Sequence, residues 1–94
     1  MSNSSYSFNR KKFIKALQEW CGGRFNPLVG FPEKDGFLNV AYLYDDDYME
    51  LRENSELLMQ VLQSKLHVPV VVFTEPVDKA KGTELHCDEW LSIK

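Results

Sequence analysis

The segment from Leu38 to Phe73 constrains the fold more than any other part of the chain. It contains an apolar strand over 38–44, three consecutive aspartates, a helical pattern that continues to about Lys65, and a second apolar run over 68–73. Two parallel strands joined through a helix form a crossover unit, which needs a sheet on one side of that helix. The rest of the chain is therefore expected to pack onto this unit.

A helix is predicted before this unit, starting near Asn9. Asn9 is a good N-cap, and apolar residues follow at three- and four-residue spacing until Gly22–Gly23 ends the pattern. Phe8 and Phe13 stand at the positions of a hydrophobic staple across this cap. The pattern predicts a helix with one apolar stripe.

A β-hairpin is predicted between this helix and the acidic turn. Its strands are 25–31 and 37–44, and Pro32–Gly36 supplies the residues typical of a turn. Pro27 removes a backbone donor, so the first strand is expected at an edge or as an irregular strand. The second strand is apolar on both faces, which predicts a central strand covered on both sides.

The second helix is predicted to begin in the aspartates, where Asp47 and Glu50 fit an acidic capping box. A break at Asn54–Ser55, with Ser55 as a new N-cap, is the alternative to one continuous helix. The apolar run 68–73 is expected to be a buried parallel strand, followed by a loop over 74–82.

The fold class predicted from these elements is α+β, in a single domain over 1–94. We expect a small mixed β-sheet of three to five strands with two main helices, in the order (β)αββαβ(β), ferredoxin-like or a related two-layer sandwich. The optional first strand runs through Tyr6 and Phe8, in a lead over 1–7 expected to be flexible. Residues 84–93 fit either a half-buried strand or a short helix.

The hydrophobic content and net charge of the chain limit the classes of protein to which it can belong. The chain is 44% hydrophobic and 13% aromatic, which is enough to form a core, and its net charge of -3 argues against a general nucleic-acid binder. The charge is uneven, because residues 1–24 carry +4 and the remainder carries -7. We find no secretion signal and no apolar stretch of membrane-spanning length, so a cytoplasmic protein with free thiols at Cys21 and Cys87 is expected.

The acidic turn of Asp45, Asp46 and Asp47 is the first candidate site. Ligands of open α/β sheets bind beyond the carboxyl ends of strands, and three carboxylates could hold a divalent metal ion in a small enzyme. Aspartates before a helix more often cap its free N–H groups, and consecutive aspartates point to different sides. The helix cap with a solvated turn is the favoured interpretation, so no metal is predicted.

Two further groups of polar side chains are candidate sites. Arg10, Lys11, Lys12 and Lys15 lie in the first turns of the first helix, where they form either an anion-binding or nucleic-acid-binding site or a solvated face. His86 and Cys87 are neighbours, and neighbours on a strand point to opposite faces, so they do not predict a catalytic dyad. We predict no catalytic residue and no cofactor.

Aromatic residues beside carboxylates give the leading functional hypothesis. Tyr42, Tyr44 and Tyr48 cluster around the aspartates, and Trp90 is flanked by acidic residues, a composition typical of protein-binding surfaces. We expect a non-enzymatic interaction or regulatory module that binds a protein partner, or itself as a homodimer. The predicted surface consists of Tyr44, Asp45, Asp46, Asp47, Tyr48 and Trp90.

Overall fold

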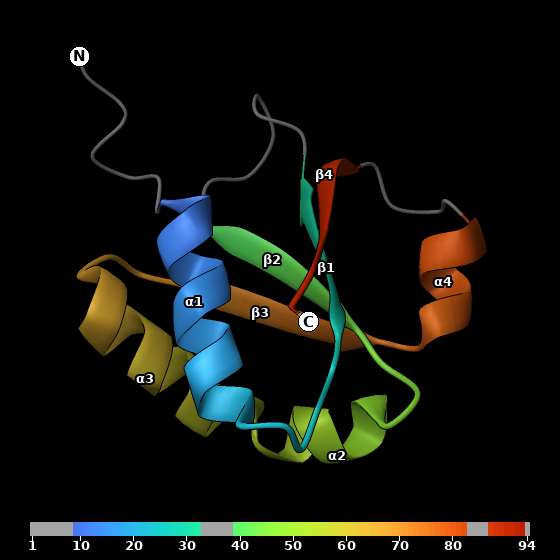
Figure 1. Ribbon diagram of the computed structural model, residues 1–94, viewed down its shortest axis with the longest axis horizontal. Helices are drawn as coiled ribbons and strands as arrows, with labels where there is room; N and C mark the ends of the chain where they lie inside the picture. Colours follow the sequence, from blue (N-terminus) through green and yellow to red (C-terminus); the bar gives the residue numbers. More distant parts are fainter. Residues whose placement is uncertain (1–8, 33–38, 83–86, 94) are drawn as a thin grey trace.

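A four-stranded mixed sheet forms the centre of the computed structural model, which describes residues 9–32, 39–82 and 87–93 (Figure 1). The predicted α+β class is confirmed. The elements, in chain order, are α1 (Arg10–Cys21), β1 (Leu28–Pro32), β2 (Val40–Tyr44), α2 (Tyr48–Glu53), α3 (Ser55–Leu66), β3 (Val71–Glu75), α4 (Val77–Gly82) and β4 (Cys87–Ser92).

The strands lie in the order β3-β2-β1-β4. As predicted, β1 and β2 form an antiparallel hairpin, and β2 and β3 are parallel across the intervening helices. The C-terminal segment is a strand, β4, which pairs antiparallel with β1. The edge position expected for β1 is wrong, because β1 lies between β2 and β4. The alternative of an irregular strand is confirmed, because the β1–β4 register shifts between Phe31 and Pro32, at the end of the strand.

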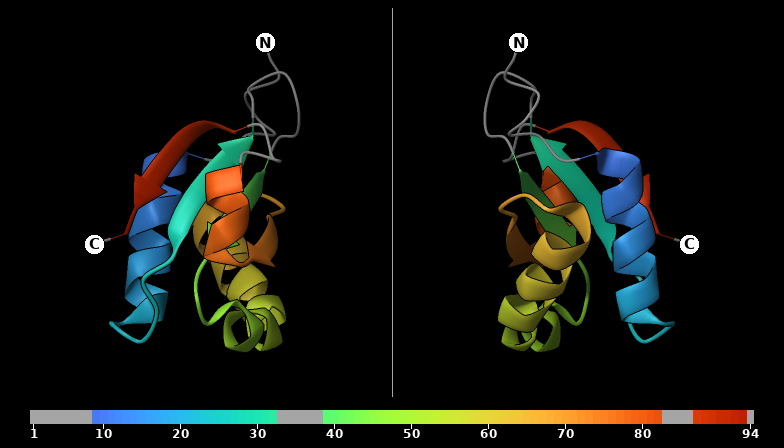
Figure 2. Two further views of the ribbon diagram at one scale, coloured as in Figure 1. Left: turned by 90° about the vertical axis from the view of Figure 1, so that its right-hand side faces the viewer. Right: turned by 90° about the vertical axis from the view of Figure 1, so that its left-hand side faces the viewer.

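The core lies between the sheet and two helices. Figure 2 shows α1 and α3 side by side on one face of the sheet, which gives the predicted two-layer arrangement. Apolar side chains on alternate strand positions meet the apolar stripes of the helices, as a strand period of two and a helix period of 3.6 require. The buried cluster includes Phe13, Ala16, Leu17, Cys21, Val29, Phe31, Ala41, Leu43, Leu51, Leu58, Leu62 and Val72.

Local side-chain chemistry fixes the ends of α1. The Asn9 carbonyl oxygen Oδ1 accepts hydrogen bonds from the backbone N–H groups of Lys11, at 2.9 Å, and Lys12, at 3.1 Å. Gly22 ends the helix in the left-handed conformation, with φ of 54°. Both predicted caps are confirmed, whereas the staple partner Phe8 falls outside the described residues.

Replacing Asn9 with alanine should lower the free energy of unfolding by about 1 kcal/mol, the usual cost of losing an N-cap. The change leaves two backbone donors without their acceptor and touches no core residue. Urea denaturation of Asn9→Ala and Asn9→Ser measures the effect. Serine can still accept these hydrogen bonds, so an equal loss of stability in both variants would contradict the capping role.

The second helical segment is divided at the predicted weak point. Helix α2 ends at Glu53, and α3 starts at Ser55 with Asn54, rather than Ser55, in the N-cap position. The expected capping box is wrong, since the Asp47 side chain makes no capping hydrogen bond. Asp45 Oδ1 instead accepts a hydrogen bond from the Asp47 N–H at 2.8 Å, so a short turn closed by this side chain directly precedes α2.

The apolar run 68–73 differs from its prediction in burial. Strand β3 is parallel as expected, but it is an edge strand with alternating burial: Val72 and Thr74 are buried, whereas Val71 is 42% and Phe73 46% exposed. The expected loop over 74–82 is also wrong, because β3 continues to Glu75 and helix α4 follows. No described helix has the length and apolar character needed to cross a membrane.

Cys21 and Cys87 are thiols rather than members of a disulfide, as predicted. Burial raises the pKa of Cys21 from 9.0 to about 11, with a smaller opposing effect from nearby Arg24. The folded state therefore binds this proton more tightly than the unfolded chain does. Its contribution to stability is complete below pH 9 and is lost as the pH rises towards 11.

We therefore expect the unfolding free energy of the wild type to fall between pH 9 and 11 more steeply than that of Cys21→Ala, which lacks the titrating thiol. Urea denaturation at several pH values measures both slopes. Because other groups common to both proteins also titrate here, the difference between the slopes is the relevant quantity. Parallel curves would contradict the raised pKa.

Candidate functional site

The sheet face turned away from α1 and α3 carries a continuous row of aromatic side chains. Tyr42 stacks on Phe73 with ring centroids 5.3 Å apart and lies 6.4 Å from Tyr44, whose ring is 5.2 Å from that of Trp90. Val71 shares this face with Phe73, two positions along β3. We call these five residues the aromatic face. Val71, Phe73 and Trp90 are among the exposed large hydrophobic residues of the protein.

Helix α4 lies on the same side of the sheet as the aromatic face. Figure 1 shows α1 and α4 on opposite sides of β1 and β4, and Figure 2 agrees. The pairing explains this position, because β3 and β4 are parallel strands at opposite edges. A right-handed connection in that direction must cross the face opposite α3. With only six residues, α4 is too short to cover four strands.

Gly30 allows Trp90 to lie across the sheet towards Tyr44. Gly30 and Trp90 are direct partners in the β1–β4 pairing. A β-carbon on Gly30 would lie 2.9 Å from Trp90 Cζ3 and 3.0 Å from Cys87 Sγ, which is too close for either atom to stay in place. The absence of a side chain at position 30 therefore leaves the space that the Trp90 ring occupies.

Gly30→Ala should lower the free energy of unfolding by about 1 kcal/mol, because overpacking against Trp90 and Cys87 outweighs the gain of replacing a strand glycine. The Trp90 ring should also shift, which changes the tryptophan fluorescence. Adding Trp90→Leu removes the clash with the indole ring, so the double variant should lose less stability than the two single changes added together. Additive losses would show that Gly30 and Trp90 do not interact.

Tyr44 supports the aromatic face from within. It is only 1% exposed, and its hydroxyl group is buried close to Cys87. Burial, with smaller contributions from Cys87 and Tyr42, raises the pKa of Tyr44 above its ordinary value of 10.0. The predicted contact residue Tyr44 is thus a neutral ring that packs beneath Trp90, rather than an exposed contact.

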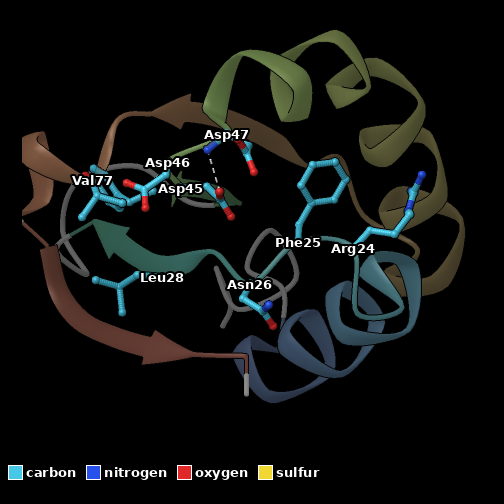
Figure 3. Close-up of a pocket in the computed structure, with 9 residues that line it drawn as sticks. Arg24, Phe25, Asn26, Leu28, Asp45, Asp46, Asp47 and Val77 are labelled. Atoms are coloured by element: carbon cyan, nitrogen blue, oxygen red, sulfur yellow. Dashed lines mark hydrogen bonds between the residues drawn. The ribbon is translucent and has the colours of Figure 1, made fainter.

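A pocket of about 290 Å³ lies at one end of the aromatic face (Figure 3). Its walls come from residues 24–26, from the acidic turn and from Val77 of α4. We call it the acidic pocket, because all three predicted aspartates line it. Asp46 and Asp47 are exposed, and Asp45 is half-buried. Leu28 and Tyr44, which also line the pocket, are direct partners on β1 and β2.

Arg24 lines the same pocket but does not neutralise the aspartates. Its guanidinium lies 5.4 Å from the Trp20 ring centre and 5.3 Å from that of Phe25. Figure 3 shows the side chain directed away from the acidic turn, and no described salt bridge joins it to these aspartates. The acidic pocket therefore has an excess of negative charge.

The aspartates do not form a chelating set with other ligands. Within the described ranges, no group of three or more His, Cys, Asp and Glu residues could hold a metal ion. Asp45 already accepts a hydrogen bond from the Asp47 N–H, while its own N–H donates to the Glu75 carbonyl at 3.1 Å. The turn is therefore held by the Asp45 side chain and by a backbone hydrogen bond to β3. Tyr48, the next predicted site residue, is half-buried, with the Arg52 guanidinium 5.3 Å from its ring centre.

The predicted anion-binding residues are separated by the fold. Arg10 forms an ion pair with Glu89 at 3.0 Å and also donates a hydrogen bond to the Pro32 carbonyl at 3.1 Å. Its guanidinium also lies 4.8 Å from the centre of the Phe31 ring. These contacts tie α1 to β1 and β4, so Arg10 has a structural role.

The lysines of α1 are exposed, and α1 itself lies on the other side of the sheet from α4 (Figure 2). Lys12 and Lys15 line a groove of about 270 Å³ between α1 and α3, together with Lys65. Lys65 forms an ion pair with Glu19 at 3.2 Å. Lys11 is exposed but does not line this groove. The four predicted basic residues therefore do not form one site.

Sequence reasoning missed the contributions of Val71, Phe73 and Gly30. The apolar run of β3 predicted burial on both faces, and only the positions of β4 and α4 decide that one face is open. The role of Gly30 depends on its pairing with Trp90, sixty residues later in the chain.

Comparison with protein-family models, with curated proteins and with solved structures found no match.

Proposed function

We propose that this protein is a non-enzymatic interaction module that binds a protein partner through the aromatic face. The observation that carries this proposal is the exposure of Val71, Phe73 and Trp90 on one face of the sheet, joined through the stacked tyrosines. Contiguous exposed apolar surface is typical of interaction sites. Aromatic side chains also contribute most strongly to protein–protein binding energy.

The edge of β3 is less suited than the aromatic face to receive a partner. The Val71 N–H donates to the Asn39 carbonyl, so the carbonyls of Val70, Val72 and Thr74 point away from β2, and two of these three are occupied. Gln63 Nε2 donates to the Val70 carbonyl at 3.2 Å, and Arg52 Nη2 to the Thr74 carbonyl at 2.8 Å. These side chains occupy acceptors that an added strand would need.

A binding role also agrees with the chemistry of the nearby titratable groups. Tyr44 and Cys21 are buried, and burial raises the pKa of each. Both groups stay protonated at neutral pH, whereas a nucleophile needs a lowered pKa or an adjacent base. We therefore assign these two side chains a role in packing rather than a role as nucleophiles.

Site-specific photo-crosslinking tests the proposal. A photoreactive phenylalanine analogue is placed at position 73 of the full chain, in the cells that produce the protein. Leu57 provides the matched control, because it is another exposed large hydrophobic residue, on α3 rather than on the aromatic face. We expect reproducible cross-links to defined proteins from position 73 and not from position 57.

The result depends on the difference between the two positions. Cross-linked partners must also be lost when Val71→Asp is combined with the analogue at position 73, since the charge disrupts the apolar surface without entering the core. Identical cross-linked products from both positions, or none from position 73, would contradict the proposed binding face.

A further inference from the structure

We propose that the acidic pocket binds a positively charged side chain of the partner. The module would then select a segment in which a lysine or arginine lies beside apolar side chains. This inference rests on the proposed function and adds the chemistry of the partner. The observation that supports it is that the apolar aromatic face continues directly into the negatively charged acidic pocket.

The pocket and the aromatic face are close enough to engage one short segment. Tyr44 belongs to both, and Tyr42 lies two positions earlier on β2, which is about 7 Å along a strand. Leu28 extends the apolar floor on β1, directly opposite Tyr44. A segment with an apolar side chain over Tyr42 and Phe73 therefore places a neighbouring residue at the pocket.

The charges of the pocket favour a cation. Among the described residues that line it are three carboxylates and one cation, Arg24, which is directed away over two aromatic rings. The Asp45 side chain accepts a hydrogen bond within the turn, whereas Asp46 and Asp47 are exposed, and the Asp47 side chain makes no capping hydrogen bond to the described helix α2. A guanidinium or ammonium group can donate charge-assisted hydrogen bonds to these two carboxylates.

Other occupants fit the same charges less well. The exposed lysines of α1 lie on the opposite side of the sheet, so their entry into the pocket of a second copy would be a head-to-tail contact, which does not close into a symmetric dimer. A single-stranded nucleic acid could stack its bases on the aromatic face. Its phosphates would then lie beside the aspartates, which repel them.

Selection from a random peptide library displayed on phage tests the inference. The full chain is immobilised, and the same library is selected on the wild type, on Phe73→Asp and on the double variant Asp46→Asn with Asp47→Asn. The matched control is Glu53→Gln with Glu56→Gln, which removes two exposed charges from α2 and α3 outside the pocket. Circular dichroism confirms that each variant is folded.

We expect the peptides enriched on the wild type to combine lysine or arginine with apolar residues and to require Phe73. Their affinity should fall about tenfold or more in the asparagine variant, the change expected when one charge-assisted hydrogen bond is lost, and stay unchanged in the control. Raising the salt concentration should weaken their binding to the wild type more than to the asparagine variant.

The outcomes separate the two proposals. Peptides that require Phe73 but lack basic residues, or that bind the asparagine variant equally well, would overturn the charge selection and leave the binding face. If no enriched peptide requires Phe73, the proposed function itself fails. Binding of oligothymidylate that requires Phe73, or a dimer in light scattering that Phe73→Asp dissociates, would assign the face to another occupant and overturn the inference.

Discussion

Replacing Phe13 with alanine should lower the free energy of unfolding by about 3–5 kcal/mol, the typical cost of truncating a buried aromatic residue. Phe13 is completely buried, and its ring packs edge-on against Phe31 with the centroids 5.5 Å apart. The loss would remove both the transfer of the side chain out of water and its contacts between α1 and the sheet. Since small domains have limited stability, this variant should be largely unfolded at moderate urea concentration.

The same substitution at Phe73 is the matched control. Phe73 is 46% exposed, so Phe73→Ala should cost less than about 1 kcal/mol, a value within the range for surface changes. Urea denaturation monitored by circular dichroism measures both variants. Comparable losses at the two positions would contradict the assignment of Phe13 to the core and Phe73 to an open face.

The comparison of the two phenylalanines shows what the sequence can predict. Phe13 lies in an amphipathic pattern that starts at a good N-cap, so local residues predict both its helix and its buried side. Phe73 lies in an apolar run that has no alternation of polarity. Such a run fits a strand covered on both faces as well as an edge strand with one open face. Only the order of the strands and the length of α4 separate these two arrangements.

The sequence also predicted only part of the candidate site, as it did for the fold. The acidic turn was singled out because Asp45, Asp46 and Asp47 follow an apolar strand, and the structure places all three in one pocket. Trp90 was singled out from its acidic neighbours, but its contact with Tyr44 depends on the pairing of β4 with β1 and of β1 with β2. Sequence patterns over a few residues carry no information on such pairing, so the aromatic face could not be predicted as a unit.

The second large effect is expected at Arg52, where alanine should lower the free energy of unfolding by about 1.5–3 kcal/mol, the range for a lost hydrogen bond of a charged group. Arg52 Nε donates to the Thr74 hydroxyl at 3.0 Å, and Nη2 donates to the Thr74 carbonyl at 2.8 Å. Thr74 is a buried polar residue, so these bonds satisfy groups that water reaches poorly. The same substitution also removes the guanidinium from the Tyr48 ring.

Arg24→Ala is the matched control, because the exposed Arg24 guanidinium lies over two aromatic rings rather than against the backbone of a strand. It should cost less than about 1 kcal/mol, as exposed cation–π contacts do. Urea denaturation compares the two variants, and equal losses would contradict the anchoring role of Arg52.

Arg52→Ala should also aggregate faster than Arg24→Ala when the two are compared at equal fractions of folded protein. Without the guanidinium, the outward Thr74 carbonyl is open to another strand, and unguarded edge strands promote association. Light scattering over time measures this difference. The wild type thus blocks part of the β3 edge, with Arg52 and Gln63, but leaves Val71 and Phe73 of the same strand exposed. A strand whose edge is protected while its face is left apolar is better suited to bind a partner across the sheet than to extend it.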